Sequence, residues 1–248
     1  ELLGGRQRDR VAAYVSGLPE DTLRQRCELA ESWSERGFHS FKFALPIADQ
    51  GPINELKSLR ETLGRNAKIA ADLHWAFLPD EAIDLARQLD EYHPWFLEAP
   101  VATEDIEGLA RVAKESGQPI AAGEEWRTIH EARLRLDRDA CAIVQPEMGH
   151  TGITQFMRIG RYAERQGLQV MPHATIGAGI FLAASLQASA AFNHVASHEY
   201  QHSVMDEFRH FTGDVLECSD GFYMVPSGPG LGLEPSAAMR ANMERIDP

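Results

Sequence analysis

The sequence is poor in basic residues and in long apolar runs, and each shortage excludes a class of protein. Its 24 Lys and Arg stand against 37 Asp and Glu, which gives a formal net charge of −13. Because no basic cluster offsets that excess, we expect no nucleic-acid partner. The apolar runs are far shorter than the roughly 20 residues that cross a bilayer, so we expect no membrane association.

Cysteine is also scarce. Cys27, Cys141 and Cys218 are widely spaced and fit neither a zinc knuckle nor a disulfide framework, which favours a reducing cytoplasm. The first residues lack a basic segment followed by an apolar run, so we expect no signal peptide. An acidic chain of this kind can still hold a divalent cation where carboxylates cluster.

Short apolar segments alternate with stretches of helical periodicity. The expected strands cover residues 10–16, 38–45, 68–74, 95–99, 119–124, 142–147, 169–173 and 196–200. Between them apolar residues recur at helical spacing, for example over 22–36, 53–63, 81–89, 106–116, 131–136 and 153–166. No GxGxxG follows the first strand, and no GxxxxGKS or GxxxxGKT occurs, which argues against an open nucleotide-binding sheet. The pattern predicts an α/β fold, a TIM-like (β/α) barrel of eight parallel strands over residues 1–204. Residues 205–248 would form a C-terminal segment packed on the barrel.

Six polar residues fall at or near the ends of the expected strands, at a nearly constant interval. They are Asp72, Glu98, Glu124, Glu147, His173 and Glu199, with spacings of 26, 26, 23, 26 and 26 residues. One βα unit of a barrel is about that long, so we expect the six side chains to ring one mouth of the barrel. Acidic residues at strand ends can also cap the following helices, which would explain one or two of them but not the shared period. Converging carboxylates repel one another without a cation, and oxygen-only ligands favour Mg²⁺ before Mn²⁺.

Several short motifs follow one another in a characteristic order and at characteristic spacings. They are Gly37-Phe38-His39-Ser40-Phe41-Lys42, Ala71-Asp72-Leu73-His74, Leu97-Glu98-Ala99-Pro100, Gly123-Glu124, Gln145-Pro146-Glu147 and Pro172-His173. Over nearly the whole chain this order resembles the mandelate racemase branch of the enolase superfamily. The resemblance implies an enolase-type barrel domain. Its relatives also carry an N-terminal capping domain, largely missing from this chain, against which the C-terminal segment packs as well.

The resemblance also implies roles for particular residues. The ligands of Mg²⁺, or of Mn²⁺ in its place, would be Asp72, Glu98 and Glu124. His173, paired with Glu147, would be the general base that removes the α-proton of a carboxylate substrate. Lys42 would lie beside the substrate carboxylate, and a protonated Glu199 would hydrogen-bond it. An imidazole suits the base role because its ordinary pKa lies near neutrality.

Three positions depart from the pattern or refine it. Racemases of this branch carry Lys-x-Lys on the second strand, whereas Lys42-Phe43-Ala44 puts a methyl group where the second base would lie. The acid beside the base is usually Asp in this branch, and Glu147 reaches one methylene further. In Asp72-Leu73-His74, strand period places His74 on the same inward face as Asp72. Several acid-sugar dehydratases of the branch use such a histidine to protonate the departing hydroxyl, although His74 could instead pack on Trp75.

Together these features predict a Mg²⁺-dependent lyase. We expect it to dehydrate a sugar acid, an aldonate or aldarate, to a 2-keto-3-deoxy acid, and to work as a cytoplasmic homo-oligomer. The alternative within the family is a cycloisomerase, lactonising enzyme or epimerase that forms the same enediolate and loses no hydroxide.

Two other classes stay open. The run His198-Glu199-Tyr200-Gln201-His202 satisfies HExxH, a zinc hydrolase signature that requires a helix. The neighbouring Val195 and Val204 favour a strand there instead. A non-catalytic binding protein on a barrel scaffold would need no imidazole–carboxylate pair opposite the metal ligands.

Overall fold

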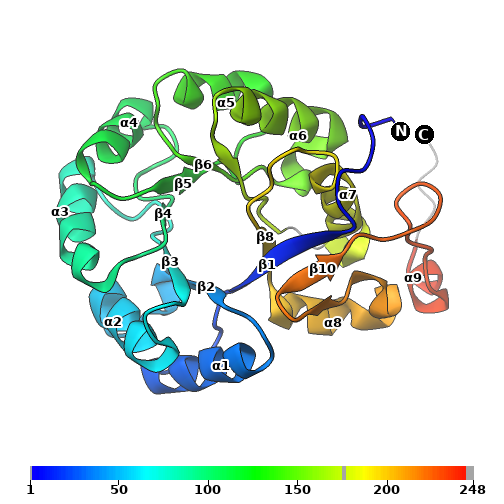
Figure 1. Cartoon of the computed structure of the whole chain (residues 1–248), viewed down its shortest axis with the longest axis horizontal. Helices are drawn as coiled ribbons and strands as arrows, with labels where there is room; N and C mark the ends of the chain where they lie inside the picture. The colour runs from blue at the N-terminus through cyan, green and yellow to red at the C-terminus, as the bar shows by residue number, and fades with distance from the viewer. Residues whose placement is uncertain (1, 175–176, 244–248) are drawn as a thin grey trace.

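Eight parallel strands form a ring in the computed structural model, which describes residues 2–174 and 177–243 (Figure 1). The strands are β1 (Arg10–Ser16), β2 (Ser40–Ala44), β3 (Lys68–Asp72), β4 (Leu97–Glu98), β5 (Ile120–Ala122), β6 (Ile143–Val144), β7 (Gln169–Val170) and β8 (His198–Tyr200). Each strand from β1 to β6 pairs in parallel with the next strand along the chain, and β8 pairs in parallel with β1. Backbone hydrogen bonds of 3.1 Å from Ala196 to Val170 and from Glu199 to Pro172 join β7 to the segment that contains β8. The expected TIM-like barrel is confirmed.

A helix follows each strand and covers the outside of the ring (Figure 1). These helices are α1 (Leu23–Glu35), α2 (Gly51–Leu63), α3 (Pro79–Leu89), α4 (Ile106–Glu115), α5 (Ile129–Leu136), α6 (Met148–Arg165), α7 (Ile180–Ser189) and α8 (His202–Thr212). Helix α1 begins with a capping box in which Thr22 and Gln25 hydrogen-bond each other's backbone. Helical periodicity does not predict α7, because this helix is mostly buried and apolar on nearly every side and so shows no polar face.

The strands β4 to β7 are shorter than the sequence predicts. Their ladders end early because the chain leaves the extended conformation, as at Ala99, with φ of 47°, and Gly123, with φ of 129°. Glu98 lies directly before the first of these bends and Glu124 directly after the second. Short strands therefore place polar side chains above the barrel interior.

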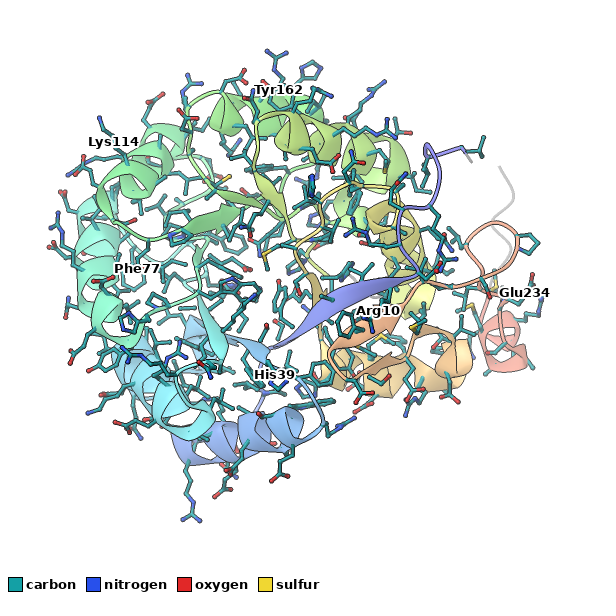
Figure 2. All side chains as sticks on the ribbon, in the orientation of Figure 1. Arg10, His39, Phe77, Lys114, Tyr162 and Glu234 are labelled. Atoms are coloured by element: carbon teal, nitrogen blue, oxygen red, sulfur yellow. The ribbon has the colours of Figure 1, made fainter. Side chains whose placement is uncertain are left out.

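The interior of the ring beneath that mouth is filled by side chains (Figure 2). One buried cluster contains Tyr14, Ala70, Phe96, Ala121, Ile143 and Met171, which lie in or directly beside six of the strands. A second and larger cluster lies between strands and helices and includes Val15, Phe41 and Leu97. The first cluster forms the floor of the mouth, so the interior of the barrel is a packed core.

The C-terminal segment packs on the barrel. Helix α8 runs through the expected boundary at residue 204, because it completes the eighth βα unit. After it, β9 (Cys218–Ser219) and β10 (Phe222–Met224) form a hairpin in which β10 pairs antiparallel with β1. The following loop is held by Gln187, whose side chain donates to the carbonyls of Pro226 and Leu231, and α9 (Ala237–Ala241) contacts α8. No helix within the described ranges is both long and apolar enough to span a bilayer.

Candidate active site

The six polar residues of the constant interval lie at one end of the ring. Asp72 and Glu98 are the last residues of β3 and β4 and sit directly opposite each other in register. Glu124 follows β5, and Glu199 lies within β8. The chain pairs Glu147 with His173 through an isolated parallel bridge beyond β6 and β7. Because the strands run parallel, their carboxyl ends meet at one end of the ring, and these residues share that mouth.

Lys42 lies among three carboxylates. Its side chain is 3% exposed, and its ammonium contacts Glu98 Oε1 and lies 3.0 Å from Glu199 Oε1 and 3.9 Å from Asp72 Oδ2. Burial alone would lower the pKa of Lys42, but the charges of Glu199 and Glu98 outweigh burial and hold it well above its ordinary value. The lysine is therefore a fixed positive charge in the interior.

His173 forms the expected pair with Glu147. Its Nδ1 lies 2.7 Å from Glu147 Oε2, and its Nε2 lies 3.4 Å from both Glu124 Oε2 and Glu199 Oε2. Because a carboxylate fixes one ring nitrogen, the other faces the centre of the mouth. Burial would lower the pKa of His173, but the facing carboxylates outweigh it and raise the pKa to about 10.

Glu199 is held by donors on several sides. Its Oε1 accepts from Ser16 Oγ and its Oε2 accepts from the backbone N–H of Ala174 at 2.9 Å. Burial would raise the pKa of Glu199, but His173 and Lys42 lower it well below its ordinary range. Two cations, His173 and Lys42, face this carboxylate and favour its ionised form, so the protonated state of Glu199 expected from the resemblance stays a prediction.

Glu98 is a buried carboxylate surrounded by other charged groups. It is fully buried, and burial raises its pKa to about 8 although Lys42 opposes the shift. The nearby carboxylates of Asp72, Glu199 and Glu124 contribute to this raised pKa.

Two of the polar residues that hold this site were not predicted. Ser16 ends β1, and Gln145 follows β6 with a fully buried side chain that donates from Nε2 to Glu98 Oε2. Strand period would have placed Gln145 on the inward face with Glu147, two residues later. That signal is weak, because an amide carries no charge.

The acidic groups at this mouth fit a divalent cation. In the part of the chain that the structure describes, no three acidic, imidazole or thiol groups already stand in the arrangement of a metal site. The ammonium of Lys42 and the imidazole of His173 nevertheless share more carboxylates than they can neutralise, namely Asp72, Glu98, Glu124, Glu147 and Glu199. Such an excess of buried negative charge is costly, and a hard cation with oxygen ligands relieves it.

His74 lies elsewhere than its spacing predicted. The strand β3 ends at Asp72, and His74 and Trp75 both have left-handed backbone conformations, with φ of 52° and 57°. Strand period therefore does not apply to His74. The backbone N–H of His74 donates to Asp72 Oδ1, and its exposed ring lies 4.8 Å from that of Trp75. It stands at the rim of the mouth.

Ala44 lies where the missing second base was expected, at the end of β2. It pairs in register with Asp72, so its methyl group borders the mouth. No base can act from this position.

The HExxH match does not form a zinc site. His198 lies in strand β8, where its Nε2 is hydrogen-bonded to Ser185 Oγ at 2.8 Å. His202 begins helix α8 and packs against Trp33, with ring centroids 4.9 Å apart. The two histidines belong to different elements, so the requirement of one helical face is not met.

Comparison with known proteins now decides the family. Residues 25–239 match the family described as enolase C-terminal domain-like. The chain belongs to this family. The resemblance to the enolase superfamily that the motifs indicated is thereby confirmed.

Relatives within the family carry two kinds of name. The chain is 32% identical over 240 residues to an arabinonate dehydratase of Saccharolobus solfataricus, covering 94% of this chain and 63% of the relative. It is 29% identical over 246 residues to a D-galactarolactone cycloisomerase of Agrobacterium fabrum, covering 94% of this chain and 65% of the relative. This family domain thus spans less than two thirds of the length of these curated relatives.

Solved structures agree with this assignment. A member of the enolase superfamily from Agrobacterium tumefaciens is 54% identical, with a TM-score of 0.95 over 99% of this chain and 63% of that one. A candidate isomerase from Sinorhizobium meliloti is 57% identical, with a TM-score of 0.94 over 97% of this chain and 64% of that one.

Proposed function

We propose that this protein is an enzyme that removes the α-proton of a sugar acid and then eliminates water to give a 2-keto-3-deoxy acid. One observation carries the proposal. The imidazole of His173 is held at Nδ1 by Glu147, and its Nε2 faces the same mouth as Lys42 and the clustered carboxylates. A base opposite a concentration of charge is what abstraction of a weakly acidic proton requires.

Asp72, Glu98 and Glu124 would hold Mg²⁺, with Mn²⁺ as a substitute. The bound ion would supply positive charge to the oxygens of the substrate carboxylate as their negative charge grows. Lys42 adds a second positive charge on the same side of the mouth.

The proton then moves through this chain's own residues. In its neutral form His173 accepts the α-proton at Nε2, and the electrons of the broken C–H bond form the carbon–carbon double bond of an enediolate. Glu147 keeps the proton on Nδ1 and stabilises the imidazolium that results. The bond from the next carbon to its hydroxyl oxygen then breaks, and His74 donates the proton with which the hydroxide leaves as water. The remaining enol becomes the 2-keto-3-deoxy acid.

Cycloisomerisation is the second candidate. It is supported by the name of the relative from Agrobacterium fabrum and by the exposed position of His74 at the rim. That reaction uses the same proton abstraction by His173 and needs no acid for a departing hydroxide.

A product assay separates the two candidates. The protein would be incubated with Mg²⁺ and a panel of six-carbon aldonic acids, aldaric acids and aldarolactones, and the products followed by NMR. We expect a 2-keto-3-deoxy acid from at least one free acid. A rearranged lactone or an epimer as the main product would overturn dehydration and leave the proton-abstraction site standing.

A further inference from the structure

Gln145 is a buried polar residue that the proposed reaction does not use. It is fully buried, and it lies inside the ring just after β6. Its Nε2 donates to Glu98 Oε2 at 2.5 Å, whereas its Oε1 has no hydrogen-bond partner among the described residues. Burying an amide that is only partly hydrogen-bonded costs free energy, so an apolar side chain would suit a purely packing role better.

The hydrogen bond from Gln145 completes a clamp on Glu98. The ammonium of Lys42 contacts Oε1 of this carboxylate, and the amide of Gln145 contacts Oε2. The two donors come from β2 and from the end of β6, which lie on either side of β4 in the ring. A carboxylate held at both oxygens from two sides has little freedom to rotate.

The floor of the ring supports this clamp. Tyr14 is fully buried beneath the mouth, and its ring centroid lies 5.9 Å from Lys42 Nζ. Its edge contacts Phe96, with ring centroids 6.3 Å apart. Buried, packed aromatic side chains therefore lie next to the charged groups that hold Glu98.

We propose that Gln145 is a positioning residue that holds Glu98 in the orientation in which it binds a divalent cation. The inference rests on the metal site of the proposed function. Hydrogen-bond partners of metal ligands fix the ligand's orientation, and their loss typically weakens metal binding by about 10–100-fold. Gln145 acts through Glu98 and does not itself contact the substrate.

Binding of Mn²⁺ alone tests this role without any substrate. Gln145→Met keeps the length of the side chain and removes the donor. Free Mn²⁺ would be measured by electron paramagnetic resonance during titration of the protein. The matched control is Gln187→Met, because Gln187 also donates from Nε2, but to the carbonyls of Pro226 and Leu231 far from the mouth.

We expect Gln145→Met to raise the Mn²⁺ dissociation constant by about 10–100-fold, and Gln187→Met to leave it within about twofold of the unaltered protein. Excess Mn²⁺ should restore α-proton exchange in Gln145→Met, which a general loss of structure would not allow. If Gln145→Met fails to fold, Gln145→Asn tests the same point, since its amide is one methylene too short to reach Glu98. Unchanged Mn²⁺ affinity in a folded Gln145 variant would overturn the inference alone. Absence of Mn²⁺ binding by the unaltered protein would instead overturn the metal site on which it rests.

Discussion

At the scale of single residues, the proposed reaction depends on the imidazole of His173 as the base. Its Nδ1 is held by Glu147 at 2.7 Å, and its Nε2 lies between two acidic groups, Glu124 and Glu199. The same carboxylates that raise its pKa to about 10 are those that a cation at the mouth would neutralise. The pKa of the proposed base therefore depends on the charge of the neighbouring carboxylates.

Replacing His173 separates proton abstraction from binding of the ion. His173→Asn removes the base while keeping a polar side chain of smaller size. We expect exchange of the substrate α-proton in D₂O to fall below detection, whereas Mn²⁺ affinity stays within a few-fold. Exchange that persists in this variant would move the base elsewhere, and Lys42 would be the first group to examine.

His74 offers a second test at this scale. If it donates the proton to the departing hydroxyl, His74→Ala should lower turnover by about 10²–10⁴-fold and spare α-proton exchange, because abstraction precedes departure. Steady-state rates of product formation and NMR of the α-proton would be compared in the same samples. Equal losses of both rates would assign His74 to the first step or to support of the mouth.

At the scale of elements, the ends of the strands carry the site, and their position could be predicted from apolar periodicity. Asp72 and Glu98 stand in register because neighbouring parallel strands end together. The same reasoning was wrong for His74, since it assumed that β3 continues past Asp72. Gln145 was part of a motif that indicated the family but received no role of its own, because an uncharged side chain carries no sign of a contact with a metal ligand.

The pairing of strands that are distant in the sequence could not be predicted from local patterns. The antiparallel match of β10 with β1 joins residues more than 200 positions apart, and nothing in the local sequence around residues 222–224 specifies that partner. Helix α7 was not predicted for a different reason: it is buried on nearly every side, so its sequence shows no polar stripe.

The bend at Gly123 is an element-scale feature that a substitution can test. A Cβ there would lie 3.1 Å from the ring of Trp126 and 3.2 Å from the backbone nitrogen of Gln145, at a φ of 129° that L-residues rarely adopt. We expect Gly123→Ala to lower the free energy of unfolding by more than about 1 kcal/mol and to weaken Mn²⁺ binding through Glu124.

Gly117→Ala is the control for this bend. Gly117 also has a positive φ, of 73°, but a Cβ there would meet nothing within 4 Å. Urea unfolding and Mn²⁺ titration of both variants would check the prediction. Equal losses of stability with unchanged Mn²⁺ affinity would show that the bend does not position Glu124.

At the scale of the whole molecule, folding buries ionisable groups whose protons are linked to stability. His198 is buried with its Nε2 facing Ser185 Oγ and its Nδ1 facing the carbonyl of Glu199, a pattern that suits a neutral ring. Burial lowers the pKa of His198 from 6.5 to about 4.

This shift predicts acid sensitivity. Below pH 6.5 the unfolded chain binds a proton that folded His198 does not take up until about pH 4, so the free energy of unfolding falls as the pH is lowered through that window. The contribution is about 2 kcal/mol between pH 6.5 and 5. Urea unfolding at both pH values should show that the unaltered protein loses about this much more stability than His198→Gln. An equal loss in the two proteins would rule out His198 as the source.

The central claim is that the mouth of this barrel abstracts an α-proton with the help of a divalent cation. The most direct measurement is proton NMR of a sugar acid in D₂O with the protein, first with Mg²⁺, then after chelation by EDTA, and again after Mg²⁺ is restored. The account predicts that the α-proton signal disappears with Mg²⁺, persists in EDTA, and disappears again when Mg²⁺ returns. Exchange that continues undiminished in EDTA would contradict it.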